Sequence, residues 1–130
     1  MKYFVGIDLG TSSVKSLLMR EDGWVAGTAQ RAYDIVKVRS DWAEQDMELL
    51  WNAARETLQE LMGKNPELRS RVAGIGYSGQ MHGLVALDKA GKPVRSAIIW
   101  ADQRSADAFE AIYRVIPGER CSSITLNTLS

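Results

Sequence analysis

Apolar residues at the start of the chain fall into three short runs separated by turns. Residues 3–7 are apolar almost throughout, which predicts a strand buried on both faces. Residues 14–19 form a second apolar run, and the turn signal Asp22-Gly23 should fold it back into a third strand over residues 24–32. Three strands joined by short turns predict an antiparallel three-strand meander.

The pattern then changes to the period of a helix. Between residues 46 and 62 the apolar side chains form one stripe with the 3.6-residue period. Asp46 should cap the start of this helix, Gly63 should close its end, and Pro66 lies beyond it. Trp51 is expected to pack against the rest of the fold.

The second half alternates short apolar runs with turns. Further strands are expected over residues 71–77, 84–87 and 95–100, the first of them buried, and a second helix over residues 105–115. Ser105 should cap that helix, and Pro117 follows its end.

Two stretches lack a regular pattern. Residues 33–41 show no clean period and are expected to be an irregular or edge segment. Residues 122–130 show no obvious terminal element, which fits either a flexible tail or a cut through a longer protein. The mixed order of strands and helices predicts an α/β fold, with one sheet covered by flanking helices.

Charge and cysteine content argue against several classes of protein. The 130 residues include 16 basic and 16 acidic side chains, a balance that argues against nucleic acid or a membrane surface as the main partner. The single cysteine, Cys121, excludes an intrachain disulfide framework and a cysteine-based zinc site. No signal peptide is visible, so a cytoplasmic protein is expected. The oligomeric state is left open, a homodimer included.

The first candidate site is the turn that follows the first strand. Asp8 stands where that strand ends, and Gly10, Thr11, Ser12 and Ser13 follow it. Backbone amides and hydroxyls of such a turn can donate to phosphate oxygens, while Asp8 can hold Mg²⁺ directly or through water. The alternative is an ordinary turn with a solvated carboxylate. The P-loop pattern Gly-x4-Gly-Lys-Ser/Thr occurs nowhere in the chain.

The second candidate site follows the strand predicted at 71–77. Residues 74–79 fit Gly-x-Gly-x-x-Gly, but no helix is expected after them, so we reject a dinucleotide-binding site. The next residues, Gln80, Met81 and His82, lie between two glycines in a loop. An amide, a thioether and an imidazole together suit a sugar. A structural role for His82, the only histidine, is the alternative.

Four segments resemble known proteins. Residues 8–12 resemble the first phosphate loop of the actin, sugar-kinase and Hsp70 superfamily. Residues 79–83 resemble the substrate loop of xylulokinases in the FGGY carbohydrate kinase family, and residues 42–46 its Trp-x-Glu-Gln-Asp segment. Residues 97–104 resemble its Ala-Ile-x-Trp-x-Asp-x-Arg segment, with Ala101 where Asn is common.

This resemblance implies a fold and a reaction. It implies an actin-like (ribonuclease H-like) fold, with residues 1–130 as the incomplete N-terminal portion of the first of two domains and the second domain absent from this chain. The reaction would be ATP-dependent phosphorylation of a ketopentose such as D-xylulose, with Mg²⁺ and with a general base downstream of residue 130.

The resemblance also assigns roles to residues. Asp8 would be the catalytic residue beside the metal and the transferred phosphate. The phosphates would bind Gly10, Thr11, Ser12 and Ser13. The sugar would contact Gln80, Met81 and His82, with Asp102 and Arg104 near the same cleft. A structural ion pair is an equal alternative for Asp102 and Arg104. An actin-like scaffold and a non-catalytic sugar-binding regulatory relative remain as rival functions.

Overall fold

A four-stranded mixed sheet forms the centre of the molecule. The computed structural model describes residues 1–128, and its main sheet contains β1 (Tyr3–Leu9), β2 (Ser13–Arg20), β3 (Val25–Ala32) and β5 (Val72–Gly79) in the order β3-β2-β1-β5. β1 pairs antiparallel with β2, which pairs antiparallel with β3. The predicted meander is therefore confirmed. β5 joins the other side of β1 in parallel.

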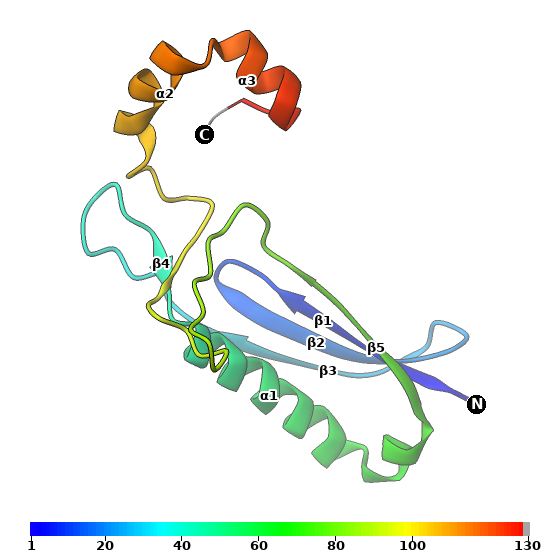
Figure 1. Cartoon of the computed structure of the whole chain (residues 1–130). Helices are drawn as coiled ribbons and strands as arrows, with labels where there is room; N and C mark the ends of the chain where they lie inside the picture. Colours follow the sequence, from blue (N-terminus) through cyan, green and yellow to red (C-terminus); the bar gives the residue numbers. More distant parts are fainter. Residues whose placement is uncertain (129–130) are drawn as a thin grey trace.

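Helix α1 (Met47–Lys64) covers one face of this sheet (Figure 1). Its start is as predicted, because the Asp46 carboxylate accepts hydrogen bonds from the backbone amides of Glu48 and Leu49 at 2.9 and 3.5 Å. Its end is not at Gly63, which lies inside the last turn. The side-chain amide of Asn65 donates to the Leu61 carbonyl instead, at 2.9 Å.

The core lies between α1 and the sheet. Its buried side chains come from the α1-facing positions of the strands and from the inner stripe of the helix, among them Val5, Val14, Leu18, Ala53 and Leu61. A hydrogen bond between the Ser16 and Thr57 hydroxyls, at 2.7 Å, crosses this interface. The predicted packing of Trp51 is wrong within the described chain, where this residue is 64% exposed on the outer side of α1.

The opposite face of the sheet carries no helix among residues 1–128 (Figure 1). The prediction that β1 is buried on both faces is therefore wrong for this structure: Tyr3 and Val5 are buried, while Phe4 on the other face is 39% exposed. The prediction of a buried strand at 71–77 is wrong for a related reason. β5 lies at the edge of the sheet, where α1 does not cover it, and Tyr77 is 82% exposed.

A short two-stranded sheet lies next to the start of α1. It pairs β4 (Glu44–Gln45) with β6 (Ala97–Ile98). The strand predicted over residues 84–87 is reduced to isolated bridges, one from Leu84 to Ile98 and one from Leu87 to Pro93. The strand predicted over 95–100 is reduced to β6. Pro93 has no backbone N–H to extend a ladder, and the Asp88 side chain caps the intervening turn.

The chain continues through helical segments that lie apart from the main sheet (Figure 1). After the 3₁₀ turn η1 (Pro66–Arg71), which links α1 to β5, these are the 3₁₀ turn η2 (Ala106–Ala108), α2 (Phe109–Val115) and α3 (Gly118–Thr125). The single capped helix predicted over 105–115 is wrong at its start, because Ser105 makes no side-chain capping bond.

Helix α3 was not predicted. Pro117 stops α2, but it also begins α3, since its carbonyl accepts the amide of Cys121 at 2.9 Å. The expectation that residues 122–130 lack an element is therefore wrong up to Thr125, and residues 129 and 130 lie outside the described residues. No helix within residues 1–128 combines the length and the apolar character that a membrane span requires.

Candidate functional site

Asp8 lies at the carboxyl end of β1, beside both neighbouring strands. Its register partners are Lys15 on β2 and Ser78 on β5. The Ser78 hydroxyl donates to Asp8 Oδ1 at 3.0 Å. Asp8 and these two partners are among the residues that line a hollow of about 790 Å³. The carboxylate is exposed to solvent and fixed in direction, as a residue facing a bound phosphate group needs to be.

The turn after β1 is closed by a short backbone contact. The Gly10 amide donates to the Ser13 carbonyl at 3.0 Å, and a Cβ at position 10 would lie 2.9 Å from that same oxygen. Any side chain at this position would displace the turn. Close backbone approach, rather than a left-handed conformation, is the reason for glycine here.

Tyr33 holds the same turn from the side of β3. Its hydroxyl donates to the Gly10 carbonyl at 2.6 Å, and its amide donates to the Ser12 carbonyl at 3.0 Å. Burial, and to a smaller extent the negative charge of Asp8, raise the pKa of Tyr33. The phenol therefore stays a hydrogen-bond donor at neutral pH.

Two of the three predicted phosphate-binding hydroxyls contact protein groups. Thr11 Oγ1 accepts the indole N–H of Trp100 at 3.2 Å and lies 3.4 Å from Gln80 Oε1, to which it donates. Ser13 Oγ accepts from Gln30 Nε2 at 3.0 Å. Ser12 is the exposed hydroxyl of the turn.

A separate cavity of about 370 Å³ contains three of the predicted sugar-site residues. His82, Asp102 and Arg104 line it together with Trp100 and apolar side chains. His82 has a left-handed backbone (φ 61°), and the next residue, Gly83, packs close to the Ile98 carbonyl. The structure does not bring the other two predicted residues into this cavity. Met81 is 74% exposed, and the Gln80 side chain turns toward the phosphate turn.

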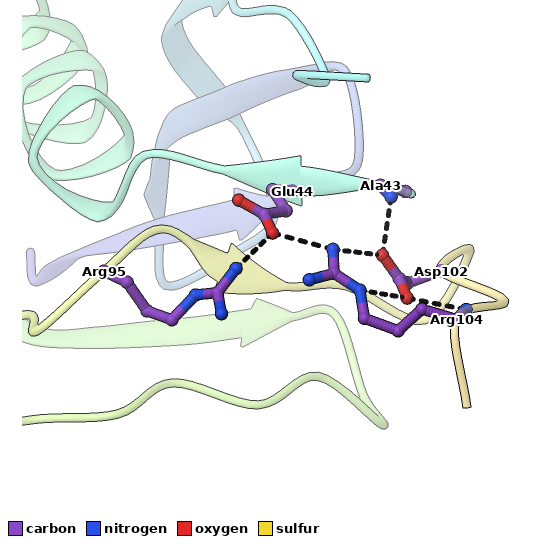
Figure 2. A network of polar contacts seen from close by, with 5 residues as sticks. All are labelled: Ala43, Glu44, Arg95, Asp102 and Arg104. Atoms are coloured by element: carbon purple, nitrogen blue, oxygen red, sulfur yellow. Dashed lines mark hydrogen bonds and ion pairs between the residues drawn. The ribbon is translucent and has the colours of Figure 1, made fainter. Parts of the chain in front are cut away.

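The wall of this cavity is fixed by an ion-pair network (Figure 2). Arg104 binds Asp102 through two nitrogens, at 2.8 and 2.6 Å, and Glu44 Oε1 at 2.7 Å, and Arg95 binds the same Glu44 oxygen. Asp102 Oδ2 also accepts the amide of Ala43 at 2.7 Å. This network joins the short sheet to the segment after β6.

The network perturbs the protonation of its members. The Asp102 side chain is 3% exposed, and its hydrogen bonds with Arg104 lower its pKa to about 2. The bond from Arg104 likewise lowers the pKa of Glu44, and the carboxylates raise the pKa of Arg104. The Arg104 guanidinium also lies 3.7 Å from the centroid of the Trp42 ring. All three charges therefore persist at neutral pH.

Comparison of the sequence with known proteins identifies the family of this chain. Residues 3–130 match the sequence profile described as the FGGY family of carbohydrate kinases, N-terminal domain. The chain belongs to the FGGY family of carbohydrate kinases.

Several relatives of this FGGY chain are xylulose kinases. It is 35% identical over 129 residues to the xylulose kinase of Staphylococcus xylosus, covering 99% of this chain and 26% of that protein. It is 40% identical over 105 residues to that of Bacillus subtilis, covering 81% and 21%. The FGGY chain therefore spans about a quarter of the length of these relatives.

A solved structure confirms the fold. The crystal structure of xylulose kinase from Rhodospirillum rubrum matches with a TM-score of 0.86 and 30% identity, over 91% of this chain and 24% of that one. The mixed α/β, actin-like sugar-kinase fold expected from the sequence is thus shown for this FGGY chain.

The side chains around Asp8 and the turn after β1 fit a loosely held Mg²⁺. No group of three or more His, Cys, Asp or Glu side chains that could hold a metal occurs among residues 1–128. Asp8 would be the one protein carboxylate near the turn. This suits Mg²⁺, which keeps several waters and binds through one or two carboxylates plus substrate phosphates.

The sequence did not indicate roles for several residues that contact the turn after β1 or line the cavity with His82. Gln45, Tyr33 and Ser78 support the turn, Lys15 lies beside Asp8, and Trp100 lines the cavity. A signal existed for Gln45, since it lies within residues 42–46, the segment that resembles the family's Trp-x-Glu-Gln-Asp pattern. No pattern in the chain indicated the partners of Tyr33 or Ser78.

Proposed function

We propose that residues 1–130 form the N-terminal portion of the first actin-like domain of a sugar kinase that transfers phosphate from ATP to a ketopentose such as D-xylulose. The observation that carries this proposal is the contact between the two candidate sites. Trp100, which lines the cavity with His82, donates to Thr11 of the phosphate turn at 3.2 Å. A sugar in the cavity would therefore lie next to the bound phosphates, as phosphoryl transfer requires.

Each residue has a role in this proposal. The backbone amides of Thr11 and Ser12 and the Ser12 hydroxyl would bind the phosphates, while Asp8 would orient the metal or its waters. His82 would hydrogen-bond a sugar hydroxyl, with Asp102 and Arg104 fixing the cavity wall. Bound Mg²⁺ supplies neutralisation of phosphate charge. The family resemblance assigns the general base to a residue beyond position 130.

The direct test is an ADP-release assay of the full-length protein with a panel of pentoses and ketoses. We expect turnover that depends on one or a few ketopentoses. Asp8→Asn should fold normally, because the side chain is exposed, but should lose kcat by roughly 100-fold, the scale of one transition-state electrostatic contact.

Asp34→Asn is the matched control, since Asp34 is also exposed but lies outside the turn. Near wild-type kcat for Asp8→Asn at saturating Mg²⁺ would contradict the role of Asp8. Sugar binding without turnover would favour a non-catalytic relative, and polymerisation without sugar binding would favour an actin-like scaffold.

A further inference from the structure

We infer that Gln45 and Gln80 act as positioning residues, forming a bridge that holds the phosphate turn and the sugar loop in one fixed geometry. This inference rests on the proposed function, and it assigns to Gln80 a role other than direct contact with the sugar. We call the pair the Gln45–Gln80 bridge. It connects β4, the turn after β1 and the loop after β5, three segments that are far apart in the sequence.

The amide N–H groups of the bridge donate toward the turn. Gln45 Nε2 donates to the Thr11 carbonyl at 2.5 Å, and Gln45 Oε1 accepts from Gln80 Nε2 at 2.8 Å. Gln80 Nε2 also donates to the Gly10 carbonyl at 3.3 Å. Because both carbonyls are acceptors only, they fix which end of each amide faces the turn.

This arrangement engages the amide nitrogen and the amide oxygen of both side chains. Both N–H groups of the Gln80 amide are engaged, and its oxygen accepts from the Thr11 hydroxyl. Gln45 is 0% exposed, so its amide could lose these partners only at the full cost of an unsatisfied buried polar group. A sugar that accepted hydrogen bonds from the Gln80 amide nitrogen would have to displace its contact with Gln45 or Gly10.

The bridge lies between the two halves of the proposed reaction. Gln80 is followed directly by Met81 and His82, while Gly10 and Thr11 belong to the turn that would hold the phosphates. Gln45 itself is fixed, because β4 pairs with β6 and the next residue caps α1. Phosphoryl transfer depends on the distance between acceptor hydroxyl and phosphate, and a displacement of about 1 Å can cost 100-fold in rate. The bridge would set that distance.

The test compares Gln45→Met and Gln80→Met in the full-length protein. Methionine keeps the length and the unbranched shape while removing the amide. Gln59→Met is the control, since Gln59 is exposed on α1. We expect both bridge variants to lower kcat by roughly tenfold, the size of one or two neutral hydrogen bonds. Calorimetry without nucleotide should show that sugar affinity changes less than about threefold.

The double variant adds a second criterion. Because both substitutions remove the same link, it should lose no more kcat than the worse single variant. The inference is overturned if the losses multiply. It is also overturned if Gln80→Met weakens sugar binding tenfold while Gln45→Met leaves kcat unchanged, which would make Gln80 a direct sugar ligand.

A measurement independent of catalysis separates this inference from the proposed function. Amide hydrogen exchange should rise together in residues 9–13 and 80–83 in either bridge variant, and in neither segment in the control. A rise confined to the segment nearest the substituted residue overturns the inference. If Gln45→Met unfolds, Gln80→Met at its half-buried position decides the result alone. If the wild type phosphorylates no sugar, the proposed function fails and the exchange experiment still decides the bridge.

Discussion

His82 combines a reactive side chain with an unusual backbone conformation. Its left-handed φ of 61° turns the loop after β5 toward the cavity shared with Trp100 and Arg104. Histidine tolerates this region better than most residues other than glycine, asparagine and aspartate. In this conformation His82 lines the cavity.

We expect His82→Ala to raise KM for the sugar much more than KM for ATP. The expected loss is about 1–3 kcal/mol, the cost of a neutral hydrogen bond together with the partner that is left unpaired. His82→Asn is the companion variant, because asparagine also adopts the left-handed conformation and retains a donor. Equal rises in both KM values would indicate a folding role instead.

Single residues differed in how well the sequence predicted them. Asp46 at the start of α1 was predictable, because a cap acts on its own next few residues. The close contact at Gly10 was foreseeable for the same local reason. The partners of Gln80 and Tyr33 were not, because those hydrogen bonds join segments whose proximity only the tertiary fold establishes.

At the scale of elements, the short sheet of β4 and β6 depends on its ion pairs. Two strands of two residues each contribute few ladder hydrogen bonds, so the bonds among Glu44, Asp102 and Arg104 carry much of the connection. Their near burial makes them less screened by water than the exposed pair of Arg20 and Asp22.

This difference predicts how stability depends on pH. The folded-state pKa of Asp102, about 2, lies below its ordinary value of 3.8, so its contribution is fully present above about pH 4 and is lost as the pH falls toward 2. Asp102→Asn should lower the free energy of unfolding at pH 7 by about 1–3 kcal/mol and flatten the profile between pH 4 and 2. Urea unfolding across this range measures both effects.

Asp22→Asn provides the comparison. The pKa of Asp22 is also lowered to about 2 by its bond with Arg20, but its side chain is 51% exposed. Because solvent screens this exposed pair, Asp22→Asn should change the free energy of unfolding much less than Asp102→Asn does. Equal effects of the two substitutions would show that burial does not strengthen the Asp102 network.

Elements with strong local patterns were predicted well. The meander and α1 follow from strand runs, a tight turn and one apolar stripe, all of which act over a few residues. The predicted strands at 84–87 and 95–100 largely failed, because an apolar run becomes a strand only when a partner extends the ladder. Pro93 limits that partner here. Helix α3 was missed because Pro117 both ends one helix and begins the next.

At the scale of the whole molecule, one face of the main sheet carries no helix in the part of the chain that the structure describes. Phe4 is partly exposed on this face, and Gly6 and Gly76 line the hollow that also contains Asp8. The chain spans about a quarter of the length of its xylulose kinase relatives. The sequence predicted the family, because the family's motifs are short segments that can be recognised without the rest of the fold. The exposure of this face could not be judged from apolar runs alone, because those runs do not reveal what covers them.

We expect residues 1–130 alone to show no sugar-dependent ATP turnover. They would supply one phosphate turn and one wall of the sugar site, while the resemblance places the general base elsewhere. Sugar binding should be millimolar at best, on the order of 4 kcal/mol. A coupled ADP-release assay and calorimetric titration, run beside the full-length protein, test this. Turnover by the fragment that Asp8→Asn abolishes would show that these residues already contain a base and a nucleotide pocket.

The strand order also determines when the site comes together during folding. β1 meets β2 across a short turn, whereas β5 reaches β1 only after β2, β3 and α1 have intervened. Hairpins close within microseconds, and pairings between distant segments are slower because a long loop must close first. We therefore expect the meander to form early and β5 to dock late. Asp8 would gain its bond from Ser78, and the turn its bonds from Gln80, only in that last step. An early intermediate would carry the Asp8 turn, yet it would lack the geometry to act on phosphate.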